Sequence, residues 1–547
     1  MKRYYSLLAL LCCCVPSAWA QIERNQNGEI SDEEVVIIKE KELKLPEAVR
    51  NFEKVTIPLP VPAPTPQKYS FQTFGATLPA IDPRMSVVRL PEDELDKLYG
   101  TYLKGGLGNY GTTYLEAFHN SKRTNDYAYG VHFKHFASAK GSVKNSGSGE
   151  NRFAGYGKYF NEKYILTGRL DYSRERYNYY GYPTEVSKDS LKQIYNTLSF
   201  GATLQNATDS AAFNYVGNIN FSNFSDSHKN RESEFGIGFN SSYKLNETMT
   251  LFVPLEVALL QYKNDTLSLG RNYTALRPSF QYKEGALTAS VGFNLGFCND
   301  TAKLATKTTI YPTVELAYQL MGGSLTALAG FNGDLEKRTY RNTVQLNPFV
   351  KGELPLSHAN KTMDLYAGFK GVIAKDFFYK ITGGMQQYKQ LAFFVSDTAD
   401  VAKFTLAYDS AKVNITRFTG EFGYAPSDKW RFAFKTDYYG YSTKKLAKAW
   451  HSPALRMNLN TRYNYREKVY IDFDLYYIGT QYAFNPLTNQ TQELKGIADV
   501  DLRIDYKFSQ KFSAFLNMDN ILSQKNPRYL YYQTRGLLVM LGATASF

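Results

Sequence analysis

The sequence predicts an all-β fold: a transmembrane antiparallel β-barrel of about 22 strands, preceded by a short, partly disordered N-terminal periplasmic arm. Four observations lead to this prediction. Apolar and polar residues alternate along successive segments, and short and long connections alternate between those segments. Aromatic residues make up 15% of the chain. After its first 20 residues the chain has no apolar run of about 18 residues that could form a transmembrane helix. Together these features indicate a wall of strands with lipid on one side and water on the other.

The clearest predicted strand runs from Ala498 to Phe508. Its even-numbered residues are apolar or aromatic, whereas its odd-numbered residues are charged. Successive side chains of a β-strand point to opposite faces, so this strand has one apolar and one charged face. A half-buried strand of a soluble protein would alternate in the same way, but the neighbouring segments repeat the pattern and favour a barrel. These segments are 430–438, 455–465, 469–477 and 537–547.

Residues 1–20 have the features of a secretory signal peptide. Lys2 and Arg3 precede an apolar run that extends to Val15, and a small-x-small cleavage site ends at Ala20. The run is too short for a membrane-spanning helix. Its cysteines do not indicate a lipoprotein, because Leu11 precedes the first of them where a small residue is required.

Residues 21–96 are predicted to form the periplasmic arm. An acidic stretch leads into a short β-prone run, and prolines then occupy every second position from Pro58 to Pro66. This spacing favours an extended polyproline II spacer of roughly 3.1 Å per residue. The arm has too few alternating segments to belong to the barrel wall, although its end could enter the lumen.

Residues 97–547 are predicted to form the barrel. Short turns are expected near residues 124, 161, 208, 247, 284, 322, 375, 427, 467 and 509. Longer or more polar connections are expected at 139–150, 177–190, 338–359, 390–411, 441–452, 482–495 and 523–535. This alternation is typical of barrels in which tight periplasmic turns oppose extracellular loops, and an even strand number places both termini on the periplasmic side.

The formal charge of +13 is unevenly distributed. Acidic residues outnumber basic ones in the arm, so the barrel carries the excess of Lys and Arg. No basic helix or aromatic RNA-binding motif accompanies this charge, and no nucleic-acid partner is predicted. The charge is expected in the lumen and the loops, where it would favour anionic groups such as lipopolysaccharide phosphates or an acidic plug.

The end of the chain resembles the last hairpin of TonB-dependent receptors. The segment that carries the resemblance is Asn517-Met518-Asp519-Asn520-Ile521-Leu522, followed by an aromatic loop with Tyr529, Tyr531 and Tyr532 and a last strand that ends at Phe547. The resemblance covers about residues 97–547 and implies an outer-membrane barrel of about 22 strands, in contact with membrane lipid. It also implies that Phe547 is the C-terminal signal read by the β-barrel assembly machinery during insertion.

A segment of the arm resembles the TonB box of the same family. It reads Glu33-Glu34-Val35-Val36-Ile37-Ile38, and the resemblance implies that it pairs with TonB, or with another periplasmic protein, by strand addition. The chain departs from the family between this segment and the barrel, because residues 39–96 are too few for a globular plug. The lumen is therefore expected to be filled by the arm, by loops folded inward, by lumen side chains or by another protein.

No catalytic, cofactor or metal site is predicted. The segment Gly106–Gly111 has the glycine spacing of a dinucleotide-binding motif, but it joins two predicted strands and opens no helix, which indicates a tight turn. His132 and His135 are three residues apart on one predicted strand and would face opposite sides. Cys298, the one cysteine outside the signal peptide, is interpreted as an incidental free thiol with no intramolecular disulfide partner.

A polar network is predicted on the lumen side of the last strands. Pairing these strands across the loop 482–495 would set Asp474 near Arg503 and Asp472 near Asp505. Cross-strand ion pairs lining a filled lumen are the favoured interpretation, and a calcium site or an acid–base pair is the alternative. The members of the network are Asp472, Asp474, Asp499, Asp501, Arg503, Asp505, Arg456 and Arg462.

Two functions follow from these expectations. The first is a TonB-dependent-receptor-like outer-membrane barrel, without a full plug, that binds or transports a ligand. The second is a non-transporting barrel that serves as a structural subunit of an envelope complex, with its arm docked to a periplasmic or surface partner. The short arm favours the second and the segment 33–38 favours the first, which we prefer; an enzyme is not expected.

Overall fold

The computed structural model describes residues 98–122, 124–184, 191–208, 210–300 and 307–547. The predicted signal peptide, the arm and its segment 33–38 lie outside the described residues. Twenty-five hydrogen-bonded segments form one antiparallel sheet. Segments β9 and β10 follow one another within a single strand, as do β11, β12 and β13 within the next, so the wall has 22 strands, the predicted number.

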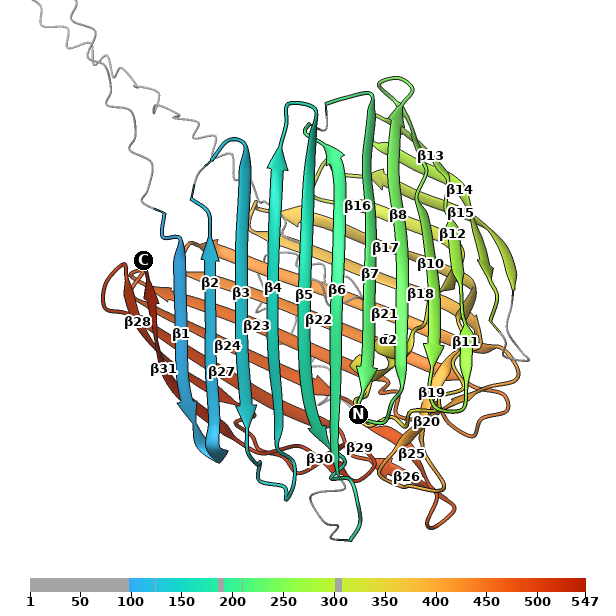
Figure 1. The fold of residues 1–547 in the computed structure, drawn as a ribbon. Helices are drawn as coiled ribbons and strands as arrows, with labels where there is room; N and C mark the ends of the chain where they lie inside the picture. The colour runs from blue at the N-terminus through green and yellow to red at the C-terminus, as the bar shows by residue number, and fades with distance from the viewer. Residues whose placement is uncertain (1–97, 123, 185–190, 209, 301–306) are drawn as a thin grey trace, which may run out of the picture. The chain divides into compact units, whose positions relative to one another are not determined.

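The wall strands succeed one another around the barrel in chain order, as the colour gradient in Figure 1 shows. Their bounds are β1 Thr101–Gly108, β2 Thr112–Asn120, β3 Tyr127–Ser138, β4 Ser148–Phe160, β5 Tyr164–Asn178, β6 Lys192–Asn206, β7 Phe213–Asp226, β8 Arg231–Lys244, β9 Met249–Phe252, β10 Leu255–Lys263, β11 Ser268–Gly270, β12 Tyr273–Leu276, β13 Ser279–Glu284, β14 Leu287–Cys298, β15 Thr308–Gln319, β16 Thr326–Glu336, β17 Ala359–Ile373, β18 Phe377–Lys389, β21 Val413–Ser427, β22 Trp430–Ser442, β23 Leu455–Tyr465, β24 Val469–Ile478, β27 Ile497–Lys507, β28 Phe512–Asp519 and β31 Leu538–Ser546.

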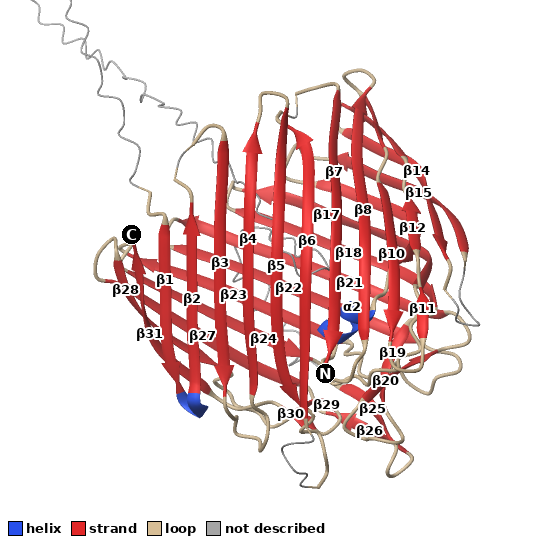
Figure 2. Cartoon of the chain, viewed as in Figure 1, coloured by secondary structure: helices blue, strands red, loops and turns tan. Residues whose placement is uncertain are grey.

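Short turns connect the strands at the end of the barrel that holds the C-terminus, and most of the longer connections lie at the opposite end. Each short turn lies where the sequence predicts it. The connections at that opposite end contain elements of their own, which Figure 2 shows. These elements are η1 Asn109–Gly111, α2 Tyr340–Leu346 and the small hairpins β19 Ala392–Ser396 with β20 Phe404–Tyr408, β25 Gln481–Asn485 with β26 Gln490–Leu494, and β29 Pro527–Tyr529 with β30 Tyr532–Gln533.

The outer surface of the wall is apolar. On one row across β3, β4 and β5, Phe133 faces Phe153, which in turn faces Tyr172, and all three side chains are exposed. Exposed aromatic side chains in contiguous cross-strand rows are expected where a barrel contacts lipid. No helix in the described part of the chain is long and apolar enough to cross a bilayer.

The barrel closes where β1 pairs with β31, the first strand with the last. At this seam Gly542 lies opposite Gly106, and the Phe515 ring covers both positions. A Cβ on Gly542 would lie 2.1 Å from the carbonyl oxygen of Gly105 and 2.3 Å from the Phe515 ring. Closure therefore requires glycine at this position, because no side chain fits between the ring and the neighbouring backbone.

Substituting Gly542 by valine is expected to impair closure. Overpacking of this kind costs about 1–3 kcal/mol, and the protein should show a smaller fraction of the heat-modifiable, compact band on cold gel electrophoresis after refolding in detergent. The matched control is Gly105→Val on the same seam, where an added Cβ meets nothing within 4 Å. Equal folded fractions for the two variants would contradict this account of the seam.

Candidate functional site in the folded loops of the barrel

Six long connections at one end of the barrel pack together, and we call them the loop cap. They follow β5, β16, β18, β22, β24 and β28, which are distributed around the wall. Because the connections arise on different sides and share buried residues, they are folded across the barrel rather than extended from it. The loop cap comprises 179–191 (with 185–190 outside the described residues), 337–358, 390–412, 443–454, 479–496 and 520–537.

The centre of the loop cap is aromatic. The Phe349 ring stacks on Tyr532 with 3.7 Å between ring centroids, and Tyr180 meets Tyr532 edge-on at 4.9 Å. Phe404 contacts both Tyr529 and Tyr532. These residues come from four different connections, so the aromatic contacts hold the connections together.

Tyrosine hydroxyls fix the cap to the barrel wall and to itself. From the inner face of the wall, Tyr195 on β6 donates a hydrogen bond to the carbonyl of Pro348 at 2.8 Å. From the connection 520–537, Tyr529 donates to the Leu346 carbonyl at 2.6 Å, and Tyr532 donates to the carbonyl of Ala402 in the connection 390–412. Each of these hydrogen bonds satisfies both a buried hydroxyl and a loop carbonyl. Loops that are removed from water need such partners for their backbone groups.

A wall carboxylate holds the helix of the cap. Glu232 on β8 is buried and accepts hydrogen bonds from the backbone N–H groups of Tyr340 and Arg341, at 2.7 and 3.0 Å. These are the first residues of α2, whose N-cap is Thr339. The first N–H groups of a helix lack intrahelical partners and favour negative charge, so Glu232 binds the helix end to the wall.

His358 ties the end of the connection 337–358 to a buried ion pair. Arg271 and Asp300 contact each other at 2.8 Å with almost no exposure, and Asp300 also accepts from the His358 backbone N–H. The ring Nδ1 of His358 accepts from the Arg338 N–H at 3.0 Å, so this nitrogen is unprotonated. Burial, reinforced by the adjacent Arg271, lowers the pKa of His358 to about 4.

His451 joins four connections of the loop cap. Its backbone N–H donates to the Tyr482 carbonyl, its Nδ1–H donates to the Phe394 carbonyl at 2.8 Å, and its Nε2 accepts from the Leu530 N–H at 3.3 Å. Its ring meets Phe404 edge-on. Both ring nitrogens are thus satisfied only in the neutral form, and burial lowers the pKa of His451 to about 4.

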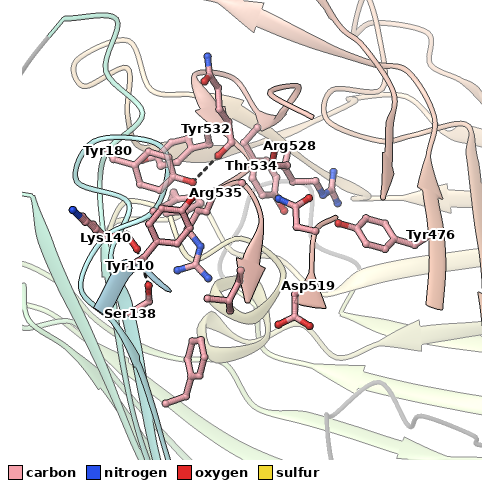
Figure 3. Close-up of a pocket in the computed structure, with 18 residues that line it drawn as sticks. Tyr110, Ser138, Lys140, Tyr180, Tyr476, Asp519, Arg528, Tyr532, Thr534 and Arg535 are labelled. Carbon is pink, nitrogen blue, oxygen red and sulfur yellow. Dashed lines mark hydrogen bonds between the residues drawn. The ribbon is translucent and has the colours of Figure 1, made fainter. Parts of the chain in front are cut away.

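A cavity of about 380 Å³ lies between the connection 520–537 and the inner wall. The wall side is formed by inward-facing residues such as Phe136 and Tyr476, and the cap side by Tyr180 and Tyr532. Figure 3 shows Lys140 and Arg535 on one side of the cavity and Tyr476 and Asp519 on the other. A volume of this size holds a small molecule.

The charge of the cavity lining is mainly positive. Lys140, Arg528 and Arg535 line it against the single carboxylate of Asp519. Arg528 donates to Gln481 and Arg535 to Ser146 and Ser148, all neutral acceptors. Neither arginine forms an ion pair within the described residues. Burial lowers the pKa of Arg528, as expected for a guanidinium taken out of water without a carboxylate beside it. The cavity is therefore suited to an anionic group.

The predicted lumen network is present in part, with a corrected register. Asp472 lies opposite Arg503, and Asp474 opposite Asp501, so the predicted pairs Asp474–Arg503 and Asp472–Asp505 are wrong by two residues. The cause is the loop, since the wall pairing begins at Ile478 and β25 and β26 form a separate hairpin beyond it. A slip of two residues keeps every side chain on its face, which is why the lumen assignment is unaffected.

The members of this network do not gather into one site. Arg462 forms an ion pair with Asp472 at 2.6 Å, and Arg503 donates to Asn517 instead of to a carboxylate. Asp499 is fully buried and accepts from the Leu522 N–H, which fixes the start of the connection 520–537. Asp501 accepts a hydrogen bond from the Asn520 backbone N–H in the same way. Asp505 lies opposite Phe515, and Arg456 lies opposite Asp437. Within the described ranges, no group of three or more His, Cys, Asp or Glu side chains is arranged to hold a metal ion.

The remaining predicted features are placed as follows. Gly106–Gly111 contains the turn between β1 and β2, as predicted. His132 contacts the inward-facing Glu116 at 3.0 Å, whereas His135 contacts Asn151 on the outer row, so the two histidines face opposite sides. Phe547 follows the last strand, where its backbone pairs with Thr101 at the seam.

Loops folded inward were one filling of the lumen expected from the sequence, but the residues that join the loop cap and the cavity beside it were not identified from it. Glu232, His451, Arg528 and Arg535 act through contacts with residues 47 to 389 positions away, which no local pattern reveals. One signal was present: connections that should be polar are rich in tyrosine, at residues 177–182 and 529–532. Aromatic side chains in that number are typical of a segment with a core of its own.

Comparisons with known proteins agree with this architecture. No protein-family model matches the sequence, and no curated protein does. Among solved structures, the FrpB iron transporter from Neisseria meningitidis (F3-3 variant) matches with a TM-score of 0.65 and 10% identity, covering 83% of this chain and 82% of that one. The siderophore receptor PirA from Acinetobacter baumannii matches with a TM-score of 0.62 and 11% identity, covering 82% of this chain and 80% of that one.

The chain has the fold of a TonB-dependent receptor barrel. A mutant of the ferric enterobactin receptor PfeA from Pseudomonas aeruginosa also matches, with a TM-score of 0.61 and 11% identity over 82% of this chain and 80% of that one. These neighbours are described as transporters and receptors. At such identity the likeness shows the fold, a closed antiparallel barrel of 22 strands like the barrels of these neighbours.

The loop cap is expected to loosen in acid. A histidine whose pKa falls from its ordinary 6.5 to about 4 on folding leaves the unfolded cap with more bound protons between these values. The contribution of each neutral histidine to the stability of the cap is therefore fully present above pH 6.5. It declines by about 1.4 kcal/mol per pH unit for each histidine as the pH falls toward 4. The emission of Trp450, which is buried in the cap, should shift to longer wavelength across this window.

The control for this titration is a Trp430→Phe background, since Trp430 lies beside a short turn at the other end of the barrel. In that background His451→Gln, which cannot titrate, should narrow the acid-induced shift. An emission maximum that stays constant from pH 7 to pH 4 would contradict the assignment of both histidines as buried neutral groups.

Proposed function

We propose that this protein is an outer-membrane barrel that binds an anionic small molecule in the cavity beneath the loop cap and passes it toward the periplasm. The observation that carries the proposal is the cavity itself, with two arginines that face neutral acceptors and aromatic walls from the cap. Anionic groups pair with guanidinium, and aromatic side chains supply apolar contact. The neighbours named above are an iron transporter, a siderophore receptor and a ferric enterobactin receptor, so ferric chelates are the first ligands to test.

The proposed orientation places both termini in the periplasm and the loop cap at the cell surface. Short turns at the terminus end and long connections at the other support it. In this proposal residues 1–20 are removed as a signal peptide, and residues 21–96 form the periplasmic arm. The residues Glu33 to Ile38 would contact TonB, and membrane lipid would surround the wall.

The loop cap takes the place of a globular plug in this proposal. Its connections interlock through tyrosine hydroxyls and through His451, so that passage requires the cap to loosen. The same interlocking favours the second candidate, a structural subunit of an envelope complex, because a fixed cap offers a constant surface to a partner. The two functions differ in whether a ligand enters the cavity.

Ligand binding is expected to depend on the two arginines. Arg528→Gln combined with Arg535→Gln should weaken the binding of ferric chelates at least tenfold, because a hydrogen bond to a charged group contributes about 1.5–3 kcal/mol. Binding is measured by isothermal titration with ferric citrate and ferric enterobactin. The control Arg431→Gln with Arg466→Gln removes the same charge at the terminus end of the barrel and should leave binding unchanged. Absence of ferric-chelate binding to the unmodified protein would count against the proposal.

Energy coupling is expected to depend on the arm. Deleting residues 33–38 should abolish uptake of the ligand by cells while leaving its binding to the purified protein unchanged, because the segment acts on the periplasmic side. Unchanged uptake, together with stable envelope partners in an affinity purification, would refute transport and support the structural subunit.

A further inference from the structure

The outer face of β5 to β10 carries a row of polar and basic residues beyond its apolar band. The row follows the backbone pairing directly: Lys263 on β10 faces Arg231 on β8, which faces Ser225, and the row continues to Arg174 on β5. Its five members in order are Lys263, Arg231, Ser225, Asn196 and Arg174. The row has three cations and no acid.

An apolar row lies four residues away on the same strands and the same face. It consists of Leu259, Phe235, Phe221, Phe200 and Leu170, which pair across the same neighbouring strands. At about 3.4 Å per residue the two rows are roughly 14 Å apart along the strands. The apolar row is part of the lipid-facing band, so the basic row lies at the height where the polar headgroups of the membrane begin.

The cations of the row have no side-chain partner among the described residues. Arg174, Arg231 and Lys263 are exposed, and none of them forms a hydrogen bond or ion pair through its side chain within the described residues. Arg231 and Lys263 are direct cross-strand neighbours, an arrangement of like charges that destabilises a sheet unless an anion lies between them. Lys192 on the adjoining β6 adds a further exposed cation on this face.

The nearby carboxylates of the described residues do not neutralise the row. Glu232 and Asp226 point inward, where both are buried in the anchoring of α2. Asp265 contacts Lys229 at 2.9 Å in the neighbouring turns. The described residues of the outer face therefore present a net positive, lipid-adjacent surface about four strand spacings wide, roughly 19 Å.

We infer that this row, Arg174 with Arg231 and Lys263, binds the phosphate groups of a phosphorylated glycolipid in the outer leaflet, that is, lipopolysaccharide. The apolar row contacts the acyl chains, and the basic row meets phosphates at headgroup height, where exposed cations gain most from anionic lipid. The amide of Asn196 and the hydroxyl of Ser225 offer hydrogen bonds between the cations. The inference rests on the proposed orientation, since it places this end at the cell surface.

The test is retention of lipopolysaccharide by the purified full-length protein, counted by native mass spectrometry in detergent. The triple variant Arg174→Gln, Arg231→Gln, Lys263→Gln should retain at least fivefold less lipopolysaccharide than the unmodified protein. The charge-matched control Lys163→Gln, Lys429→Gln, Lys511→Gln, in short turns at the terminus end, should retain the normal amount. Folding of each variant is verified by its heat-modifiable mobility, and the single variant Lys263→Gln serves if the triple variant does not fold.

Rebinding assays separate the sources of phosphate. Delipidated protein is titrated with lipopolysaccharide, with phosphatidylglycerol and with inorganic phosphate, and only lipopolysaccharide should bind with a dependence on the basic row. Normal retention by the triple variant would overturn the inference. Equal, row-dependent binding of phosphatidylglycerol would also overturn it, because the face would then recognise anionic lipid of either leaflet. Arg174, Arg231 and Lys263 do not line the cavity, so ferric-chelate binding should be unaffected by these substitutions, and failure here is distinguishable from failure of the proposed function.

Discussion

Pairing of the backbone hydrogen-bonding groups is the constraint on which this structure depends. A sheet in lipid cannot leave an edge unpaired, because each unpaired N–H or C=O group costs several kcal/mol without water. The chain meets this requirement by pairing its first strand with its last, and glycines at the seam let the two backbones approach under the Phe515 ring. Once the wall is closed, alternation assigns every side chain to the lipid or to the lumen.

The same constraint explains the character of the loop cap. Connections that fold across a barrel leave water and bury backbone groups that no strand pairs. Tyrosine hydroxyls, the Glu232 carboxylate and the two ring nitrogens of His451 supply the missing partners. These donors and acceptors come from distant parts of the chain, so the cap is held by tertiary contacts and not by local structure. A cap of this kind can respond to acid, because its histidines are satisfied only when neutral.

The wall could be predicted from the sequence; inward-folded loops were one of several expected fillings of the lumen, but the contacts that build the cap could not be predicted. Strand alternation is local and repeats with a period of two, which fixed the lumen face of Asp472 and Asp501 even where the predicted register was wrong by two residues. The contacts of His451 and Arg528 join connections that are far apart in the sequence, and no periodicity encodes them. The basic row of β5 to β10 is intermediate between the wall and the cap in this respect. Alternation places each of its residues outward, but only the strand register aligns Arg231 with Lys263.

The central claim is that the loops of this chain, and not a globular plug, close the barrel. Single-channel conductance in planar bilayers tests it most directly, with the full-length protein compared with a form that lacks residues 21–96. The account predicts low conductance for both at pH 7, and a rise for both near pH 4 as His358 and His451 become charged. A large, steady conductance at pH 7 on removal of the arm would show that the arm fills the lumen and would contradict the account.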